Sequence, residues 1–315
     1  MNLAVSDSES DSVSEPALIG IDWGTSSFRA FLINTQGKVL ERLSAPEGIM
    51  HVPDGDFDAA FERLLSPWTK TYQLPVIASG MITSRNGWVE TPYVNAPTGV
   101  DGLAKSLVEH KTKSGTTVCF VTGMTISHGD VPDVMRGEET QIFGALATGM
   151  SDGVFVMPGT HSKWIVVRNG QIVDYWTYMT GEVFGVLCQH TILGTLMKDG
   201  PFSEQGFRKG VEAGRKAGSN LLNYLFHVRT LPLFDKMPED MVADYLSGML
   251  IGAEIQGIAP GLSLNETGVT SVGSSDLVNR YEIALQVFGL KSQRAPEDIV
   301  AGGHFAIASA AGLIS

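Results

Sequence analysis

A glycine-centred hairpin that occurs twice is the feature that most constrains how this chain can fold. In residues 19–34, IGIDWGTSSFRAFLIN, an apolar strand-like run ends at Asp22, and a Gly-Thr-Ser-Ser turn leads into a second strand-like run. Residues 155–176, FVMPGTHSKWIVVRNGQIVDYW, repeat this order around Gly159-Thr160 and contain an Asn-Gly hairpin signal. The sequence therefore predicts two copies of one hairpin-led unit.

Helix-like runs follow both hairpins and alternate with strand-like runs. Helical spacing covers residues 56–69, 101–111, 181–197, 202–225, 238–256 and 275–288, whereas apolar runs at 76–78, 117–122 and 268–272 indicate strands. Strand followed by helix, repeated, is typical of an α/β architecture. The turn-rich sequence TGMSDG separates the two copies, so we expect domains at residues 17–149 and 150–315.

Residues 1–16, MNLAVSDSESDSVSEP, are acidic and rich in serine, without a basic segment or an apolar core. They predict a disordered tail and not a signal peptide. No apolar run approaches the roughly 18 residues of a membrane span, so we expect no membrane partner. Cys119 and Cys188 are far apart in the sequence, which indicates reduced thiols and a cytoplasmic protein.

The net charge of −12 argues against a nucleic-acid partner, because such binding depends on clustered Lys and Arg. An anionic ligand would have to be held by a few local cations, for which the candidates are Arg29, Arg85, Arg136 and Lys163. The sequence lacks the P-loop motif, the G-x-S-x-G elbow of serine hydrolases and grouped His or Cys ligands for zinc. A bound nucleotide would therefore need a phosphate cradle without the P-loop lysine.

The paired hairpins resemble those of the actin, hexokinase and Hsp70 ATPase fold, in which two similar ribonuclease H-like domains enclose a nucleotide cleft. That resemblance implies that both turns present backbone N–H groups to the phosphates of ATP, with Mg²⁺ supplying countercharge. A third element, at a strand-to-helix junction, would carry adenosine or serve only as a helix cap. The residues implied as nucleotide contacts are Gly24, Thr25, Ser26, Gly159, Thr160, His161, Gly273 and Ser274.

Three acidic residues are candidates for the chemistry. Asp22 ends an apolar strand, where a carboxylate is unfavourable unless it is paired, so it would hold hydrated Mg²⁺ or cap the turn amides. Glu138 and Glu139 open a helix in VMRGEETQIFGAL, a position that the helix macrodipole alone would favour. We expect Glu138 to accept a hydroxyl proton, with Glu139 as the alternate base.

Three cations are candidates for contacts with the reactants. Arg136 would hold a substrate carboxylate or simply pair with the adjacent glutamates, and Arg29 is a further candidate for the substrate. Lys163 would stabilise the charge that develops on a transferred phosphate. Strand alternation, however, turns either His161 or Lys163 away from the cleft.

Five motifs resemble the 2-dehydro-3-deoxygalactonokinase family, and they occur in the same order along nearly the whole chain: IDWGTSSFRAFL, VMRGEETQ, VMPGTHSKW, MTGE at 179–182 and YLSGMLIGAE at 245–254. The resemblance implies an ATP- and Mg²⁺-dependent kinase that phosphorylates the C6 hydroxyl of 2-dehydro-3-deoxy-D-galactonate in galactonate catabolism. Glu139, Met81 and Trp88 are further candidates for the sugar pocket, although Met81 and Trp88 suit a hydrophobic core equally well.

Several alternatives stay open from the sequence. The Glu-Glu pair also resembles that of exopolyphosphatases of the same fold, which makes a phosphohydrolase the first competitor. A non-catalytic nucleotide sensor is the second, and a kinase for the epimeric 2-dehydro-3-deoxygluconate is the third. The assembly is open as well, with a homodimer as one possibility.

Overall fold

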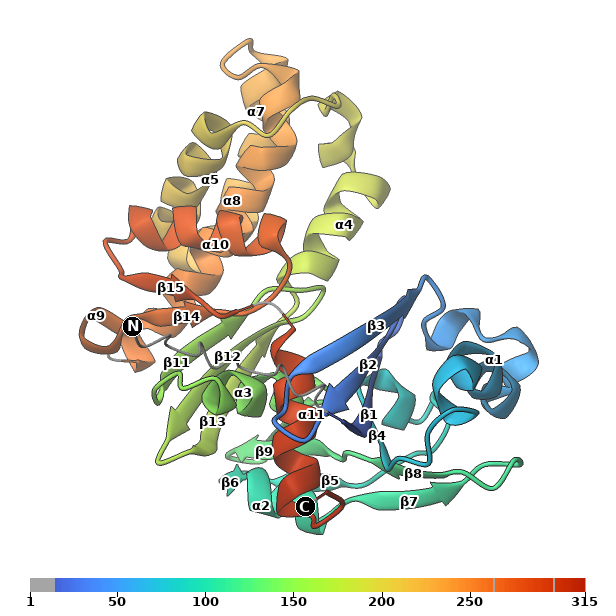
Figure 1. Cartoon of the computed structure of the whole chain (residues 1–315). Helices are drawn as coiled ribbons and strands as arrows, with labels where there is room; N and C mark the ends of the chain where they lie inside the picture. Colours follow the sequence, from blue (N-terminus) through green and yellow to red (C-terminus); the bar gives the residue numbers. More distant parts are fainter. Residues whose placement is uncertain (1–14, 263, 297, 315) are drawn as a thin grey trace, which may run out of the picture.

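The computed structural model describes residues 15–262, 264–296 and 298–314, and the expected tail lies almost entirely outside these ranges. Within them, two six-stranded sheets and one three-stranded sheet form the framework (Figure 1). Helix α11 (Ile299–Ala310) runs between the two large sheets. No helix of the described part is long and apolar enough to cross a membrane.

The first large sheet has the strand order β3-β2-β1-β4-β8-β7. The first predicted hairpin lies at its centre, because β1 runs antiparallel to β2 and parallel to β4. Helix α1 (Phe57–Thr69) packs on this sheet through buried Phe61 and Trp68, which join Trp23 and Phe28 in one apolar cluster. The strands are β1 (Pro16–Trp23), β2 (Phe28–Asn34), β3 (Val39–Ala45), β4 (Val76–Ser79), β7 (Val108–Lys111) and β8 (Thr117–Phe120).

The second large sheet repeats this arrangement in the order β15-β14-β11-β12-β13-β6. Strand β11 runs antiparallel to β12 and parallel to β14, just as β1 does to β2 and β4. The predicted duplication is therefore confirmed. Strand β6, from the first half of the chain, pairs with β13 in this sheet. The strands are β6 (Thr98–Gly99), β11 (Gly153–Met157), β12 (Ser162–Arg168), β13 (Gln171–Tyr178), β14 (Val269–Ser271) and β15 (Ser292–Arg294).

Helices cover the second sheet and extend well beyond it, as Figure 1 shows for α5, α7 and α8. Helices α5 and α8 approach closely through glycine: a Cβ on Gly210 would lie 2.0 Å from Tyr245 O, and one on Gly248 would lie 2.1 Å from Phe207 O. The helices are α4 (Thr180–His190), α5 (Glu204–Ala217), α6 (Leu221–Leu225), α7 (His227–Leu233), α8 (Val242–Ile258), α9 (Leu264–Thr267) and α10 (Ser275–Val287).

Three predicted helices differ from their sequence pattern. The run over 202–225 is divided into α5 and α6 by a 3₁₀ turn at Gly218–Asn220, and two others are shorter than expected. The helix expected over 101–111 is wrong for its second half: α2 (Val100–Lys105) ends at Ser106, whose hydroxyl donates to Leu103 O, and the chain continues as β7 beside β8. The run over 181–197 is helical only to His190. There Thr191 accepts a hydrogen bond from Leu193 N and starts a separate 3₁₀ turn. In both places a short polar side chain ends the helix locally.

Two crossing helices connect the halves of the molecule. Helix α3 (Glu138–Ala147) carries the predicted catalytic glutamate, and α11 packs against it and against β1. Their backbones touch at glycine: a Cβ on Gly144 would lie 1.7 Å from Ile299 O, and one on Gly303 would lie 1.9 Å from Thr140 O. The small-residue sequence around Gly303 thus serves close helix packing.

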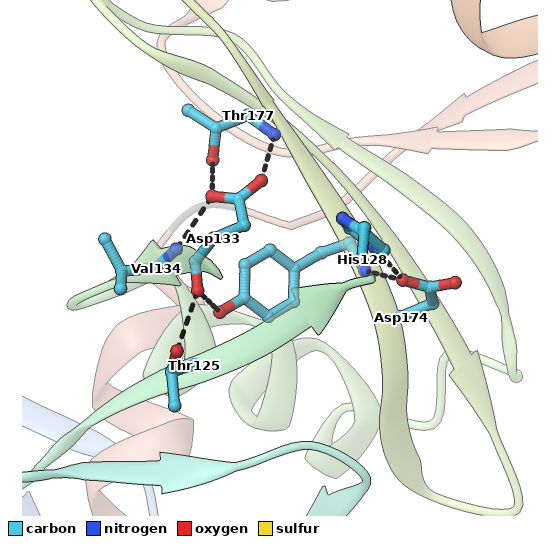
Figure 2. A network of polar contacts seen from close by, with 7 residues as sticks. Thr125, His128, Asp133, Val134, Asp174 and Thr177 are labelled. Carbon is cyan, nitrogen blue, oxygen red and sulfur yellow. Dashed lines mark hydrogen bonds and ion pairs between the residues drawn. The ribbon is translucent and has the colours of Figure 1, made fainter. Parts of the chain in front are cut away.

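The small sheet, β5 (Tyr93–Asn95), β9 (Gly123–His128) and β10 (Val131–Met135), joins the two halves through polar contacts (Figure 2). The Asp133 carboxylate on β10 accepts hydrogen bonds from the Thr177 amide at 2.8 Å and the Thr177 hydroxyl at 2.6 Å. The Tyr175 hydroxyl donates to Asp133 O at 3.0 Å, and His128 contacts Asp174 at 2.8 Å. Strand β10, which leads directly into α3, is therefore fixed to β13.

Candidate active site

A cavity of about 730 Å³ lies between the two halves and is lined by both glycine turns. Most of the side chains and turns expected at the site meet here, although they come from distant parts of the chain. They are Asp22, Gly24, Thr25, Arg29, Met81, Arg136, Glu138, Gly159, Thr160, His161, Gly273 and Ser274. Four expected residues do not line the cavity, namely Ser26, Trp88, Glu139 and Lys163.

The first turn, between β1 and β2, presents consecutive backbone donors. The Gly24 amide is used within the turn, where it donates to Ser27 O at 2.9 Å, and Ile49 N donates to Gly24 O at 3.0 Å. The amides of Thr25, Ser26 and Ser27 have no hydrogen-bond partner among the described residues. Successive free N–H groups of this kind form an anion-binding concavity. Ser26 lies in this turn but does not line the cavity.

The second turn, between β11 and β12, has the same property. The amides of Gly159, Thr160 and His161 also lack partners in the part of the chain that the structure describes. A Cβ added to Gly159 would come no closer than 3.8 Å to another protein atom, that of His161 O. Packing within the protein does not require glycine there, whereas the close approach of a ligand would.

The third element is the junction between β14 and α10. Gly273 has φ of 150°, a conformation that favours glycine, and the N-terminus of α10 follows at Ser275. Helix N-termini attract anions and polar ligand groups. Beside it lies a groove of about 510 Å³, lined by Phe202, Asp276, Asn279, Arg280, Glu282, Ile283 and Gln286.

Asp22 lies at the end of β1 and pairs with Arg29, its cross-strand neighbour. Arg29 Nε donates to Asp22 Oδ2 at 3.1 Å, and the second guanidinium nitrogen also contacts this oxygen. The Arg29 side chain is 45% exposed, so solvent screens the pair and its contribution to stability is at most about 1 kcal/mol. An incoming cation or anion can therefore compete for either partner.

The two glutamates at the start of α3 have different surroundings. Glu138 is half-buried at the cavity, and its Oε2 accepts a hydrogen bond from Arg136 N at 2.9 Å. Glu139 is 1% exposed, and its two oxygens accept from Gly137 N at 2.9 and 2.8 Å. Burial and the nearby Glu138 charge raise the pKa of Glu139 to about 7. The geometry favours Glu138 as the group that can reach a ligand.

Glu139→Gln is expected to change how stability depends on pH. A carboxyl whose pKa rises from 4.5 to about 7 on folding contributes stability that is complete below pH 4.5 and is lost as the pH rises through 7. The difference corresponds to about 3 kcal/mol. The variant should therefore gain stability relative to the wild type between pH 5 and 8, measured by urea unfolding. A pH-independent difference would contradict the assignment.

The buried cations have defined partners. Arg136 donates to Thr83 O, Thr83 Oγ1 and Thr91 Oγ1 at 2.6–2.7 Å, and its guanidinium lies 4.3 Å from the Tyr93 ring centre. No carboxylate of the described chain forms an ion pair with it, and its buried Nε has no partner there. Its fixed positive charge beside the cavity suits an anionic ligand.

Lys163 points away from the cavity. Its ammonium donates to Val134 O at 3.0 Å and to Thr177 Oγ1 at 2.8 Å, so it belongs to the contacts that hold β10 against β12 and β13. His161, in the turn just before β12, lines the cavity and contacts Glu182 at 2.5 Å. Lys163 is therefore the one of the two that faces away from the cavity, but strand alternation is not the reason, because residues two apart on a strand share a face and His161 belongs to the turn.

Trp88 lies in the core behind the site, where it packs against Phe61, His110 and Phe120 at ring-centre distances of 5.1–5.6 Å. Sequence reasoning did not single out Gln141, Pro158 or Asp298, which also line the cavity. Gln141 lies one turn after Gly137 on α3, and that helical spacing was the available signal. Asp298 directly precedes α11 and pairs with Arg42, a contact that no local pattern indicates.

Two similar domains, each with a glycine turn open to one shared cavity, define the class of actin-like ATPases and sugar kinases. Component A of (R)-2-hydroxyglutaryl-CoA dehydratase from Acidaminococcus fermentans shares this fold, with a TM-score of 0.50 at 12% identity over 94% of this chain and all of that chain.

Closer similarity identifies the family. The family model for 2-keto-3-deoxy-galactonokinase matches residues 22–307. The 2-dehydro-3-deoxygalactonokinase of Escherichia coli K12 is 34% identical over 86% of this chain and 90% of its own length. A solved structure of a protein assigned to the same activity, from Sinorhizobium meliloti, has a TM-score of 0.86 at 33% identity and covers 93% of this chain and 98% of that chain. The chain belongs to the 2-dehydro-3-deoxygalactonokinase family.

Proposed function

We propose that this enzyme transfers the γ-phosphoryl group of ATP to the C6 hydroxyl of 2-dehydro-3-deoxy-D-galactonate. It would thereby supply a phosphorylated keto-acid to an aldolase in galactonate catabolism. The family membership supports a sugar-acid kinase. One observation carries the proposal for the site: two glycine turns, whose amides lack partners among the described residues, line the same cavity as Glu138.

The residues present fit Mg²⁺-ATP. The cavity volume of about 730 Å³ lies within the range of roughly 300–1,000 Å³ typical of ligand sites, and Gly159 leaves the space that a Cβ would fill. We assign the phosphates to the amides of Thr25–Ser27 and Gly159–His161, and the adenosine to the Gly273-Ser274 junction. Asp22 would hold the hydrated metal ion, which supplies countercharge and orients the phosphates when bound.

Glu138 is assigned as the base. Its half-buried carboxylate would accept the proton of the C6 hydroxyl and orient this oxygen for in-line attack. The Arg136 amide fixes one of its oxygens at 2.9 Å and leaves the other available to the cavity. Closure of the two domains around the reactants would exclude water and so limit hydrolysis of ATP.

Arg29 is assigned to the carboxylate end of the sugar acid. Of the four candidate cations, only Arg29 and Arg136 line the cavity, and Arg85 pairs with Glu90 away from it. The Arg29 side chain is 45% exposed and pairs with Asp22, whereas the donors of Arg136 are mostly engaged by threonines and carbonyl oxygens. A guanidinium can bind a carboxylate through two parallel hydrogen bonds. Arg136 would add a fixed positive charge near the substrate, and Met81 an apolar contact.

A coupled ADP-release assay across a panel of aldonic and keto-deoxy acids tests this function. We expect Mg²⁺-dependent ADP release that requires 2-dehydro-3-deoxy-D-galactonate. ADP release without any sugar acid would identify a phosphohydrolase, and higher kcat/KM on the gluconate-derived epimer would reassign the substrate. ATP binding without turnover on any acid would indicate a sensor.

We also propose a cytoplasmic location, supported by the free Cys119 and Cys188. A homodimer stays a prediction, which light scattering of the purified chain would test.

A further inference from the structure

The carboxylate of Glu254 is an unusual feature of the second domain. It lies on α8, at the end of the motif YLSGMLIGAE, and its residue is only 3% exposed. It accepts hydrogen bonds from Ser162 Oγ at 2.8 Å, Trp164 Nε1 at 2.7 Å and Tyr281 OH at 2.9 Å, and also from Thr180 Oγ1. Within the described residues it has no ion-pair partner.

Stability alone does not explain this arrangement. Burial raises the pKa of Glu254, because desolvation disfavours its charged form. Replacing a buried ionic group with apolar residues of similar volume is often neutral or stabilising. A buried carboxylate that accepts hydrogen bonds from four neutral donors therefore indicates that the relative positions of these donors matter.

The four donors come from elements that build the nucleotide half of the site. Ser162 is the first residue of β12 and directly follows the turn Gly159–His161. Thr180 is the first residue of α4, where Glu182 N donates to Thr160 O at 2.9 Å. Helix α4 also packs tightly on this turn, because a Cβ on Gly181 would lie 2.4 Å from Gly159 O.

The remaining donor connects the carboxylate to the adenosine element. Tyr281 lies on α10, the helix that begins just after Gly273 and Ser274. Trp164, on the same face of β12 as Ser162, is the fourth donor to the Glu254 carboxylate. The Glu254 carboxylate therefore joins three elements: β12 next to the turn Gly159–His161, helix α4, and helix α10 after the Gly273 junction.

We propose that Glu254 is a positioning residue that fixes the second phosphate turn relative to the adenosine helix. The proposal rests on ATP occupying the cavity as assigned above. A carboxylate suits this position because it offers only acceptors, whereas an amide has a single acceptor oxygen and adds donors. In Glu254→Gln, at least one of the four donors would lose its acceptor, and the new NH₂ group would face other donors.

Titration calorimetry on the full chain tests this role. We expect Glu254→Gln to raise the Kd for the ATP analogue with Mg²⁺ at least about tenfold, the change expected for losing one or two hydrogen bonds to a charged group. The Kd for the sugar acid, measured without nucleotide, should stay within about twofold of the wild type. The domain that would hold the sugar acid does not contact Glu254.

Two milder variants test the same role if Glu254→Gln does not fold. Tyr281→Phe and Ser162→Ala each remove one donor and keep the carboxylate, so each should raise the Kd for the nucleotide about threefold or more. A normal Kd for the nucleotide in folded Glu254→Gln, or in both milder variants, would overturn the proposal and leave a structural role. Failure of the wild type itself to bind ATP would instead contradict the proposed function.

Discussion

Glu138→Gln is expected to lower kcat at least about 10²-fold, the usual effect of losing a general base. The amide keeps the size of the side chain but cannot accept the hydroxyl proton. Glu138 lines the cavity beside both turns, and no side chain of the described residues donates to its carboxylate. The Kd for ATP should change little, because the phosphates are assigned to backbone amides. Coupled ADP release at saturating reactants, together with calorimetry, measures both quantities.

Glu139→Gln is the matched control for this experiment. The two glutamates are adjacent in sequence and begin the same helix. Glu139, however, is buried, accepts hydrogen bonds from Gly137 N and does not line the cavity. Its variant should retain most of the wild-type kcat. Near-normal turnover in Glu138→Gln, or a larger loss in Glu139→Gln, would contradict the assignment of the base.

Gly144→Ala is expected to destabilise the protein by about 3 kcal/mol or more, because overpacking against fixed backbone is among the most damaging core changes. The new Cβ would lie 1.7 Å from Ile299 O and 2.9 Å from Gly303 N. These are backbone atoms of α11, so the clash can be relieved only by separating the two helices. Glu138 on α3 and Ile299 on α11 both line the cavity, so catalytic activity should fall as well.

Gly302→Ala tests whether the effect is specific to the crossing. Gly302 lies on α11, the partner helix at this crossing, but its Cβ would be 3.5 Å from Gly144 O, an ordinary contact. We expect a change within about 0.5 kcal/mol. Thermal and urea unfolding of the two variants side by side measure the difference. Equal stability in both would mean that the helices do not cross as described.

The sequence predicted the parts of the fold that depend on local turn chemistry. Both hairpins follow from glycine-threonine turns between apolar runs, and the alternation of strands and helices predicted the α/β class. The sequence did not predict which strands pair across long distances in the chain. Strand β6 is only two residues long and joins the sheet of the other half, a contact that is set by tertiary packing. The Ser106 hydroxyl at the end of α2 also contacts the hydroxyl of Thr122, which lies between β8 and β9.

The site was predicted best where backbone turns form it. The direction of single side chains was harder, because a strand or helix can present neighbouring residues to opposite sides. We expected one of His161 and Lys163 to face away from the cleft, but the sequence did not say which one, and it did not show that His161 lies in the turn before β12. Adjacent glutamates at a helix start were equally ambiguous until burial distinguished them. Glu254 gave no chemical signal, since its role depends on donors that lie 27 to 92 residues away.

A crystal structure with Mg²⁺, a nonhydrolysable ATP analogue and the sugar acid would test the central assignment most directly. The expected result places phosphate oxygens about 3 Å from the amide nitrogens of Thr25–Ser27 and of Gly159–His161 at the same time, with the C6 hydroxyl facing Glu138. Phosphates held by side-chain cations alone, or an analogue bound outside the cavity, would contradict the account.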